Sequence, residues 1–592
     1  MPAPDREDTI VVIGAGPAGL TAAHELVRAG HRPIVVEQGI DVGGLARTAQ
    51  HRGFHFDMGG HRFFTKVPEV QAFWRELLGS EFLRRPRLSR IYYGGTFFAY
   101  PLKPFDALRG LGVYQGIRVG LSYLKWQVWP HPQEDTFEEW VTNRFGRRLF
   151  LAFFKTYTEK VWGVPCTELR AEWAAQRIKD LSLRTALVSM FLRPGSTIKT
   201  LIEEFDYPRL GPGMMWRAVR DAVERGGGMV QLASDACRIR RDGTTVTAVE
   251  VEQDGTRTEI PVGAVISSMP VTELVARLDP PPPAPVLEAA RHLTYRDFLT
   301  VCLVLRRRDV FPDNWIYIHD TQVRVGRIQN YKNWSPDMVP DPERTSLGLE
   351  YFCTEGDDLW TMADADLIAL ATREVARIGL AAEADVEDGC VVRVPKAYPV
   401  YDSTYAEHLA VVRRFVDGLA NLQTIGRNGL HRYNNQDHAM VTGMLAVRNL
   451  LDGARHDLWS VNTDQEYHEE IREPDDALAE RIESTLGAVF SRLDRVAFGV
   501  AMGTVLGVVL FATTLVVRAP GSVAMLALLA QYFPGYRVTP VGALLALGYG
   551  FGTGFGLGFV AATLRNALAA LSLAWVHRRA EEPILRRLLD YI

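Results

Sequence analysis

The sequence predicts an α/β protein: a Rossmann-like dinucleotide-binding domain with an inserted α+β substrate domain, followed by a C-terminal transmembrane helical hairpin. Three observations support this prediction. A strand, a glycine turn, a helix and a second strand open the chain, apolar strand segments return much later, and two long runs near the C-terminus carry no charge. The 592 residues suffice for two or three domains, and the net charge of -4 argues against a nucleic-acid-binding surface.

The N-terminal unit has the pattern of a dinucleotide site. Gly14, Gly16 and Gly19 form GxGxxG directly after the strand TIVVI. This spacing permits a tight turn, close approach of the backbone to a pyrophosphate and close packing of the next helix. The N-terminus of that helix then faces the phosphates. Glu37 ends the second strand, where its carboxylate can hold ribose hydroxyls.

A second glycine pair favours FAD over NAD. The segment DVGGLART, which includes Gly44 and Arg47, resembles the FAD-binding signature of the amine-oxidase superfamily. FDMGGHRFFTK, IYYGGTFFAYPL and YTEKVWGVPCTEL follow in that order, and the last closely resembles a segment of UDP-galactopyranose mutases, flavoenzymes that interconvert pyranose and furanose sugars. VGRIQNYKNW, KAYPVYD and TIGRNGLHRYNNQDHAM are similar to later segments of that family, so the resemblance covers Asp8 to Leu451.

The resemblance implies a set of site residues. The catalytic residues are His61, which can tune the flavin N5, Arg327, which grips the substrate phosphate, and Trp162, which lines the sugar pocket. Beyond the residues named above, cofactor contacts are implied for Gly60, Arg427, Asp437 and Met440. Substrate contacts are implied for Trp162, Arg327, Tyr398, Tyr401, Tyr433 and Asn435. Asp437 is also predicted to cap the helix after it, whose dipole then steadies a reduced flavin.

Each assignment has a structural alternative, and the sequence departs from the family pattern in places. The alternatives are a core tryptophan for Trp162, a loop histidine for His61, a surface ion pair for Arg327, core tyrosines for Tyr398 and Tyr401, and a plain helix cap for Asp437. Phe64 replaces a second family histidine, and Asn435 and Gln436 replace family tyrosines. A family arginine on a mobile loop falls near Leu181, with Lys179 and Arg184 as candidate replacements. The clamp for a diphosphate is therefore altered.

The predicted domain boundaries are discontinuous. The FAD-binding domain is assembled from residues 1–64, 211–284 and 421–457. Residues 65–210 form a helical cap and residues 285–420 a substrate-binding sheet. Residues 458–495 form a linker helix, and residues 496–592 a membrane anchor with spans at about 496–517 and 541–564. The segments KPFDALRGLGVYQGIRVGLSYLKWQVWP and SLRTALVSMFLRP fit either buried cap helices or amphipathic docking on a membrane.

The glycines of the anchor repeat at four-residue intervals. The rows are Gly499, Gly503 and Gly507; Gly548, Gly552 and Gly556; and Gly550, Gly554 and Gly558. Small residues four apart share a helix face and let two helices approach closely in lipid, either within a hairpin or between two copies in a homodimer. Arginines flank the outer ends of the two runs, which by the positive-inside rule places both ends and the catalytic domain on the cytoplasmic face.

The resemblance and the anchor together predict a function. In the mutase family a reduced flavin attacks the anomeric carbon and expels the phosphate, and NAD(P)H is the expected reductant. A sugar linked to polyprenyl phosphate would explain both the anchor and the altered clamp. We therefore expect a membrane-bound FAD-dependent mutase for cell-envelope glycans. The alternative is an FAD-dependent oxidase or desaturase of an apolar substrate, of the porphyrin or carotenoid type. No signal peptide is expected, and five scattered cysteines predict no metal site.

Overall fold

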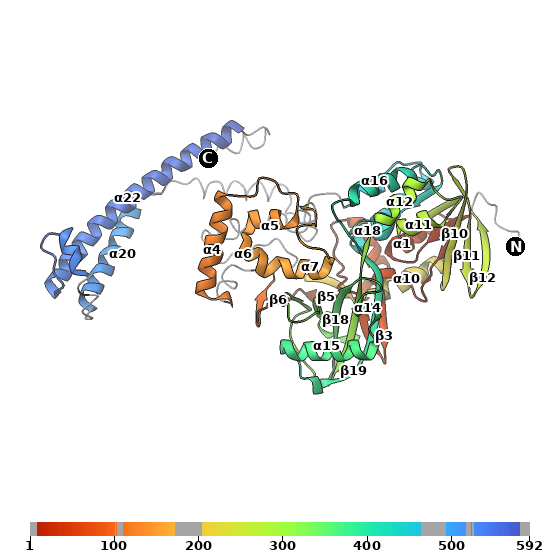
Figure 1. Cartoon of the computed structure of the whole chain (residues 1–592), viewed down its shortest axis with the longest axis horizontal. Helices are drawn as coiled ribbons and strands as arrows, with labels where there is room; N and C mark the ends of the chain where they lie inside the picture. The colour runs from red at the N-terminus through yellow and green to blue at the C-terminus, as the bar shows by residue number, and fades with distance from the viewer. Residues whose placement is uncertain are drawn as a thin grey trace. The chain divides into compact units, whose positions relative to one another are not determined.

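The computed structural model describes residues 9–100, 102, 110–171, 204–462, 493–516, 523 and 526–579, with side chains up to residue 567. The chain forms two compact units, Met1–Ile471 and Arg472–Ile592. The first unit holds the nucleotide-binding and substrate regions, and the second holds the C-terminal hairpin. The two units are described separately below (Figure 1).

The five-stranded sheet is parallel and is assembled from three distant parts of the chain. Its order is β20-β13-β1-β2-β9. The strands are β1 (Ile10–Ile13), β2 (Ile34–Val36), β9 (Met229–Gln231), β13 (Ala264–Ser267) and β20 (Leu422–Thr424). Alternate residues of β1 enter two different cores, Ile10 and Val12 on one face and Val11 and Ile13 on the other. Both faces are covered, which explains why this strand reads as an uninterrupted apolar run.

Helices cover both faces of this sheet. The first face carries α1 (Pro17–Arg28), α2 (Pro68–Leu78), α10 (Pro212–Arg225) and α18 (Gln436–Leu451). The second face carries α11 (Val271–Arg277), α12 (Ala284–His292), α16 (Tyr405–Val416) and a four-stranded sheet of order β12-β11-β10-β14. Its strands are β10 (Ser234–Asp242), β11 (Thr245–Gln253), β12 (Thr256–Pro261) and β14 (Leu278–Asp279). The mixed α/β class predicted from the sequence is therefore present.

The substrate region is a seven-stranded sheet of order β19-β15-β18-β17-β16-β6-β7. Its strands are β6 (Ser89–Tyr93), β7 (Thr96–Ala99), β15 (Tyr295–Leu305), β16 (Trp315–Ile318), β17 (Arg327–Asn330), β18 (Thr345–Cys353) and β19 (Val386–Pro399). Helix α15 (Asp364–Ile378) packs on one face. The sheet takes β6 and β7 from the segment that the sequence analysis assigned to a helical cap, because β6 pairs in parallel with β16.

The cap consists of short helices. They are α4 (Val113–Val128), α5 (Phe137–Phe145), α6 (Arg147–Phe150), the π-helical turn η4 (Leu151–Lys155) and α7 (Thr156–Trp162). Thr136 begins α5 by a capping box, in which the Glu139 N–H donates to Thr136 Oγ1 at 3.3 Å and the Thr136 N–H donates to Glu139 Oε2 at 3.0 Å. Two small pairs, β3 (Thr48–His51) with β4 (Phe54–Asp57) and β5 (Phe82–Pro86) with β8 (Glu204–Pro208), join the regions.

Single-turn elements complete the part of the chain that the structure describes. They are η2 (Gly44–Ala46), η3 (Gly79–Glu81), α13 (Tyr331–Trp334), η5 (Pro336–Met338), α14 (Asp358–Thr361), η6 (Glu383–Asp385), α17 (Gly426–Gly429) and η7 (Leu458–Ser460). The predicted linker helix at 458–495 lies mostly outside the described residues.

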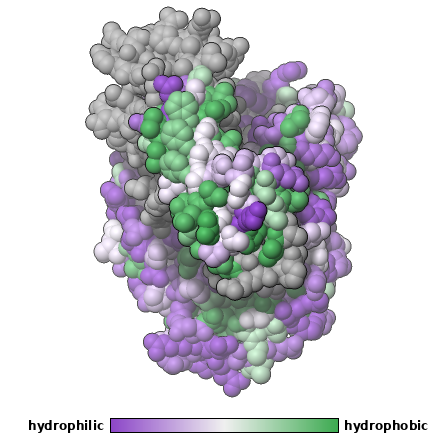
Figure 2. All heavy atoms as spheres, turned by 90° about the vertical axis from the view of Figure 1, so that its left-hand side faces the viewer, coloured by the Kyte–Doolittle hydropathy of each residue, from purple (hydrophilic) through white to green (hydrophobic). Residues whose placement is uncertain are grey.

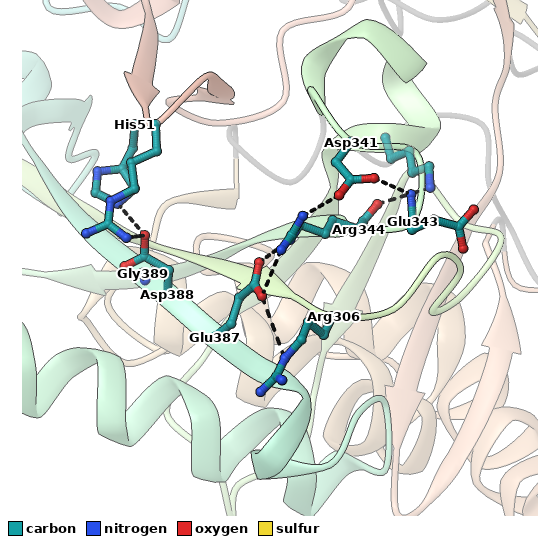
Figure 3. Close-up of polar contacts among 10 residues, drawn as sticks. His51, Arg306, Asp341, Glu343, Arg344, Glu387, Asp388 and Gly389 are labelled. Atoms are coloured by element: carbon teal, nitrogen blue, oxygen red, sulfur yellow. Dashed lines mark hydrogen bonds and ion pairs between the residues drawn. The ribbon is translucent and has the colours of Figure 1, made fainter.

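A charged network ties the β3–β4 hairpin to the substrate sheet (Figure 3). Asp388 of β19 bonds His51 Nε2 at 3.0 Å and pairs with Arg52 Nη1 at 2.9 Å. The neighbouring Glu387 pairs with Arg344, and with Arg306 at 3.6 Å. Single exposed ion pairs contribute little, but shared partners in a half-buried network reinforce one another. The hairpin that leads into the FDMGGH turn is thereby fixed against β19.

The second unit is a helical hairpin of α20 (Arg495–Val516), η8 (Leu528–Gln531) and α22 (Pro540–Arg579). Arg495–Val516 and Pro540–Ala567 are long and apolar enough to cross a membrane. Figure 2 shows the hairpin as a hydrophobic surface. Most of its side chains are open, because only 17% and 28% of the two apolar windows are buried. The second helix continues beyond the predicted end at 564.

Two of the three glycine rows hold the hairpin together. A Cβ added at Gly503 would lie 2.7 Å from the carbonyl oxygen of Phe551, and one added at Gly554 would lie 2.6 Å from that of Met502. The row of Gly499, Gly503 and Gly507 therefore faces the row of Gly550, Gly554 and Gly558 within one chain. The third row has open space, since nothing in the structure lies within 4 Å of a Cβ at Gly552.

This difference predicts two opposite mutational effects. Gly503→Leu forces the helices apart and should destabilise the hairpin by about 1–3 kcal/mol, as overpacking does elsewhere. Gly552→Leu meets no atom and removes a helix-weakening glycine, so it should be neutral or stabilising by up to about 1 kcal/mol. The measurement is the midpoint of thermal aggregation of the full chain in detergent. Equal tolerance of both substitutions would show that the close glycine contact is not used.

Candidate active site

The turn between β1 and α1 can only be made by glycines. Gly14 has φ +96°, and a Cβ there would lie 2.3 Å from Ser268 Oγ, while a Cβ at Gly19 would lie 1.9 Å from the Gly14 carbonyl oxygen. Glu37 directly follows β2 beside this turn and accepts hydrogen bonds from the Ala15 N–H at 2.7 Å and the Gly39 N–H at 2.8 Å. The helix N-terminus and the carboxylate thus face one cleft.

This cleft has a volume of about 500 Å³ and runs from Glu37 to the N-terminus of α18. Of the predicted cofactor residues, its lining includes Gly14, Gly16, Glu37, Gly44, Arg47 and Arg427. Gly44 has φ +52°, and a Cβ added to it would lie 3.1 Å from the Gly16 Cα. The backbones at Gly16 and Gly44 therefore approach too closely for a side chain at Gly44. Arg47 is held by Met58, whose Sδ accepts from Nε at 3.2 Å.

The predicted cap of α18 is wrong by two residues. Asn435 occupies the N-cap, with its N–H donating to His438 Nδ1 at 3.4 Å, and Asp437 is the second helical residue. Asp437 is buried, and as a first-turn carboxylate it still interacts favourably with the helix dipole. The reason is that Asn435 has the extended backbone that a cap requires, with φ -74° and ψ 173°.

Two predicted cofactor residues support the cleft from behind. Met440 is fully buried, and its Sδ accepts from Trp74 Nε1 at 3.2 Å. The residues of α18 that line the cleft are Gln436 and Ala439. Gly19 likewise lies outside the lining and permits the packing of α1 on the turn. Local sequence patterns identify the helix, but they do not show which of its sides faces the ligand.

A second cavity of about 90 Å³ adjoins the first. Leu45, His61, Arg427, Asn435 and Gln436 line both. The smaller cavity is also lined by Met58, Gly59, Gly60, Arg62, Phe64, Phe298, Arg327, Tyr398, Tyr433 and Asp437. An aromatic ring bound at the α18 end of the long cleft would therefore lie next to a molecule bound in the small cavity. The predicted residues from the FDMGGH, VGRIQ, KAYPVYD and HRYNNQD segments come together here.

Arg327 is fixed by a buried carboxylate. Its Nε and Nη2 donate to Glu350 Oε2 at 2.8 and 2.5 Å, and Gln329 Nε2 donates to the other oxygen at 2.5 Å. Glu350 is 0% exposed, whereas the Arg327 side chain keeps 17% exposure. Its Nη1 donates to no other residue in the described part of the chain. The guanidinium is thus held from behind with one edge left for a ligand.

Arg427 is held by carbonyls instead. Its Nε donates to the Asn434 carbonyl and its Nη1 to the Ala397 carbonyl, both at 2.9 Å. The guanidinium lies 4.7 Å from the ring centroid of Tyr433, which stacks on Tyr398 at 5.5 Å. Within the described residues no carboxylate pairs with it. Its charge therefore reaches both cavities.

The structure brings Trp162 and Tyr401 to the site as a supporting layer. Trp162 is 2% exposed and its ring lies 6.2 to 6.3 Å from the rings of Tyr398, Tyr401 and Tyr433. Tyr401 accepts the Tyr433 N–H at 2.6 Å through its hydroxyl oxygen. Neither residue belongs to the lining of the small cavity. Both hold the tyrosines that do line it.

The rest of the YTEKVWG segment positions the strand that carries Arg327. Lys160 Nζ donates to the carbonyls of Asp320 at 2.6 Å, Val323 at 2.8 Å and Val325 at 3.1 Å, and burial lowers its pKa to about 8. From the other side, Glu374 accepts the N–H groups of residues 324 and 325 at 2.6 and 3.0 Å. The role of Lys160 is not evident from the sequence, although the residue lies inside the YTEKVWG segment.

His61 is a neutral residue at the junction of the two cavities. Burial and the nearby charge of Arg427 lower its pKa to about 4. Its Nε2 bonds the Met58 carbonyl at 2.9 Å, which fixes the ring. An uncharged imidazole leaves Arg62, Arg327 and Arg427 as the cations that line the small cavity.

Gln436 was not predicted as a site residue, yet it lines both cavities. It is 8% exposed, and its Nε2 donates to the Arg62 carbonyl at 3.1 Å. Its Oε1 has no hydrogen-bond partner among the described residues. A buried amide oxygen of this kind needs a partner, which a bound ligand can supply. The candidate replacements for the family loop arginine, Lys179 and Arg184, lie outside the described residues.

These features fit a flavin dinucleotide. The glycine turn and helix N-terminus suit a pyrophosphate, Glu37 suits a ribose, and the α18 N-terminus with Arg427 suits the electron-rich edge of a flavin. The sequence profile described as flavin containing amine oxidoreductase matches residues 17–451. The chain belongs to this family. Family membership supports FAD as the cofactor of the long cleft.

Relatives in sequence are named for redox activities. The chain is 30% identical to a 15-cis-phytoene desaturase of Narcissus pseudonarcissus over 181 residues. This aligned stretch covers 30% of each of the two chains. The chain is 48% identical over 56 residues to an inactive all-trans-retinol 13,14-reductase of Danio rerio, which is 10% of this chain and 9% of that protein. The chain thus spans less than a third of the length of these relatives.

Solved structures show the fold. A reduced UDP-galactopyranose mutase aligns with TM-score 0.68 and 20% identity, covering 78% of this chain and 99% of that one. A putative protoporphyrinogen oxidase from Exiguobacterium aligns with TM-score 0.59 and 16% identity, covering 76% and 99%. The amine-oxidase fold predicted from the sequence is therefore present.

Asp57 gives a testable pH dependence. It ends β4, accepts hydrogen bonds from Tyr207 and, at 3.0 Å, from Thr48, and burial raises its pKa to about 7. The folded state then binds a proton that the unfolded state releases, so this stabilisation is present below pH 4 and is lost by about 1.4 kcal/mol per pH unit as pH rises to 7. Asp57→Asn cannot ionise and should remove this loss.

The measurement is the flavin-release midpoint of wild type and Asp57→Asn between pH 4.5 and 8, a range that brackets the folded pKa of about 7. The advantage of wild type over the variant should shrink with rising pH. Burial lowers the pKa of His61 and His431 to about 4, so these two groups make the protein more stable as pH rises, opposite to the effect of Asp57. Both histidines are present in wild type and in Asp57→Asn, so their effect cancels in the comparison. A constant difference across the range would mean that Asp57 does not carry the proton.

Proposed function

We propose that the protein is a membrane-bound, FAD-dependent mutase that interconverts the pyranose and furanose forms of a phosphate-linked sugar. The sugar is carried by polyprenyl phosphate, and the product serves cell-envelope glycan synthesis. The flavin works in its reduced form, with NAD(P)H as reductant. The observation that carries the proposal is Arg327, held by buried Glu350 with a free edge toward the small cavity beside the flavin cleft.

The reduced flavin supplies an electron-rich nitrogen that can attack the anomeric carbon. The chain's own residues bind and orient the substrate. Arg327 and Arg427 neutralise the phosphate that departs, and a guanidinium suits this because it presents paired donors to phosphate oxygens. Tyr398 and Tyr433 wall the sugar, with Trp162 behind them. Water is restricted because the cavity is small.

The altered clamp supports a monophosphate carrier. Asn435 and Gln436 stand where the mutase family has tyrosines, and both line the small cavity. Their amides can donate to one phosphate group or accept from a sugar hydroxyl. A second phosphate would require a further cation, which the described lining supplies only through Arg62.

The hairpin supports a substrate that resides in the bilayer. Arg492 and Arg495 precede the first span, and Arg565, Arg578 and Arg579 follow the second. The positive-inside rule therefore favours a cytoplasmic catalytic unit. The open row of Gly548, Gly552 and Gly556 is the surface we propose for any homodimer contact.

An FAD-dependent oxidase or desaturase is the second candidate. The identity to 15-cis-phytoene desaturase favours it. The lining of the small cavity argues against it, since Arg62, Arg327 and Arg427 give no advantage to an apolar substrate.

One assay separates the two candidates. The full chain in lipid nanodiscs is incubated with a polyprenyl-phosphate pyranose, with and without dithionite, and the ring form of the released sugar is determined. We expect furanose only with reduced enzyme, little conversion of a UDP-sugar, and no hydrogen peroxide. Turnover of an isoprenoid or porphyrin precursor by the oxidised enzyme, with no furanose, would reject the mutase.

Arg327 gives the sharpest mutational test. Arg327→Ala should lower kcat/KM about 10- to 150-fold, since a hydrogen bond to a charged group contributes about 1.5–3 kcal/mol. It should also cost about 3 kcal/mol of stability, because Glu350 is left buried beside Gln329 alone.

Arg327→Lys separates these two effects. An ammonium can still pair with Glu350, so stability and flavin content should recover, but it lacks the fork and kcat/KM should stay low. The matched control is Arg324→Ala, on the same segment as Arg327. This substitution removes only the exposed ion pair between Arg324 and Asp358, so it should leave the kinetics unchanged. Wild-type kcat/KM in Arg327→Lys would make the pair purely structural.

A further inference from the structure

Helix α4 carries an apolar row that the described residues of the catalytic unit leave exposed. Five residues recur at three- and four-residue intervals along one face, and a tryptophan follows the helix. Their exposures are Tyr114 70%, Ile117 58%, Leu121 63%, Leu124 59%, Val128 63% and Trp129 70%. Single exposed apolar residues are ordinary, but a continuous row on one helix face marks an interaction surface.

The opposite side of α4 is anchored in the cap. The helix packs against α5 and α6. Gln127 Nε2 donates to the Asn143 carbonyl at 2.9 Å, and Ser122 Oγ accepts the Arg148 N–H at 3.3 Å. Gly146 allows this contact, since its Cβ would lie 2.9 Å from the Tyr123 backbone. The helix is therefore held firmly with the row directed outward, at the edge of the cap (Figure 1).

The polar residues beside the row are basic. Arg118 lies 5.4 Å from the ring of Tyr114, and Lys125 lies 5.7 Å from the ring of Trp126. The helix Val113–Val128 has no acidic residue. Apolar and aromatic side chains flanked by lysine and arginine are the composition of helices that lie in the interface of an anionic membrane.

The tail of the same chain brings a bilayer within reach. The first of the two spans begins at Arg495, and the chain between Asn462 and Leu493 can extend over at most roughly 110 Å. A tethered unit meets the membrane at a high effective concentration, so a short amphipathic face suffices for docking. A free soluble partner would have no such advantage.

We propose that α4 is an interfacial anchor by which the catalytic unit docks on the anionic leaflet that holds its hairpin. The apolar row enters the boundary between headgroups and acyl chains, and Arg118 and Lys125 contact lipid phosphates. This contact rests on the hairpin crossing a membrane and is independent of which substrate the enzyme converts. It gives the catalytic unit a fixed face toward the lipid.

The test places an environment-sensitive fluorophore on the full chain in nanodiscs. Leu121→Cys and Leu124→Cys report on the row, Gln115→Cys on an exposed polar position of the same helix, and the labelled parent chain gives the background of the native cysteines. Flavin content verifies that each variant is folded. Quenchers attached to lipid acyl chains are then compared in discs with and without anionic lipid.

We expect lipid quenching at residues 121 and 124, none above background at Gln115→Cys, and weaker quenching at the row without anionic lipid. Arg118→Glu with Lys125→Glu should reduce quenching in anionic discs. A blue-shifted label that lipid quenchers do not reach would show that another segment of this chain covers the row. A shift that disappears at one protein per disc would show a second copy. A water-exposed label overturns the proposal as well.

Discussion

The site depends on one buried carboxylate. Glu350 has no exposure and lies directly opposite Arg327 in the antiparallel pairing of β18 with β17. A charge at such a position is tolerated only with a partner and further hydrogen bonds, which Arg327 and Gln329 provide. A slip of one residue in this pairing would turn Arg327 to the other face of the sheet. The register of two strands thus sets where the cation stands.

Other contacts protect this register. Lys160 binds the carbonyls of the segment before β17, and Glu374 binds its N–H groups, so the segment is satisfied from both sides. The FDMGGH turn is fixed separately through Asp57 and the network around Asp388. The surfaces that we propose to contact lipid lie on α4 and on the hairpin, so the proposed chemistry of the site and the proposed attachment to a membrane use different surfaces.

The parts that could be predicted from the sequence are local. Gly14, Gly16 and Glu37 are fixed by a turn and a strand end, and their arrangement in the structure follows from a few neighbouring residues. The four-residue spacing of the tail glycines likewise has a local meaning, although the sequence does not show which row faces which. The parts that required the structure depend on tertiary contacts. Glu350, Lys160 and Gln436 carry no pattern of their own, and the burial of Trp162 behind the tyrosines follows from packing alone.

The central claim is that this site breaks the bond between the anomeric carbon and a phosphate oxygen. Positional isotope exchange tests it directly, with a polyprenyl-phosphate sugar carrying ¹⁸O at the bridging oxygen and phosphorus NMR as the readout. The account predicts that the label scrambles into the non-bridging positions with reduced enzyme, does not scramble with oxidised enzyme, and scrambles far more slowly in Arg327→Lys. Conversion of the sugar without scrambling, or scrambling that is independent of the flavin's redox state, would contradict it.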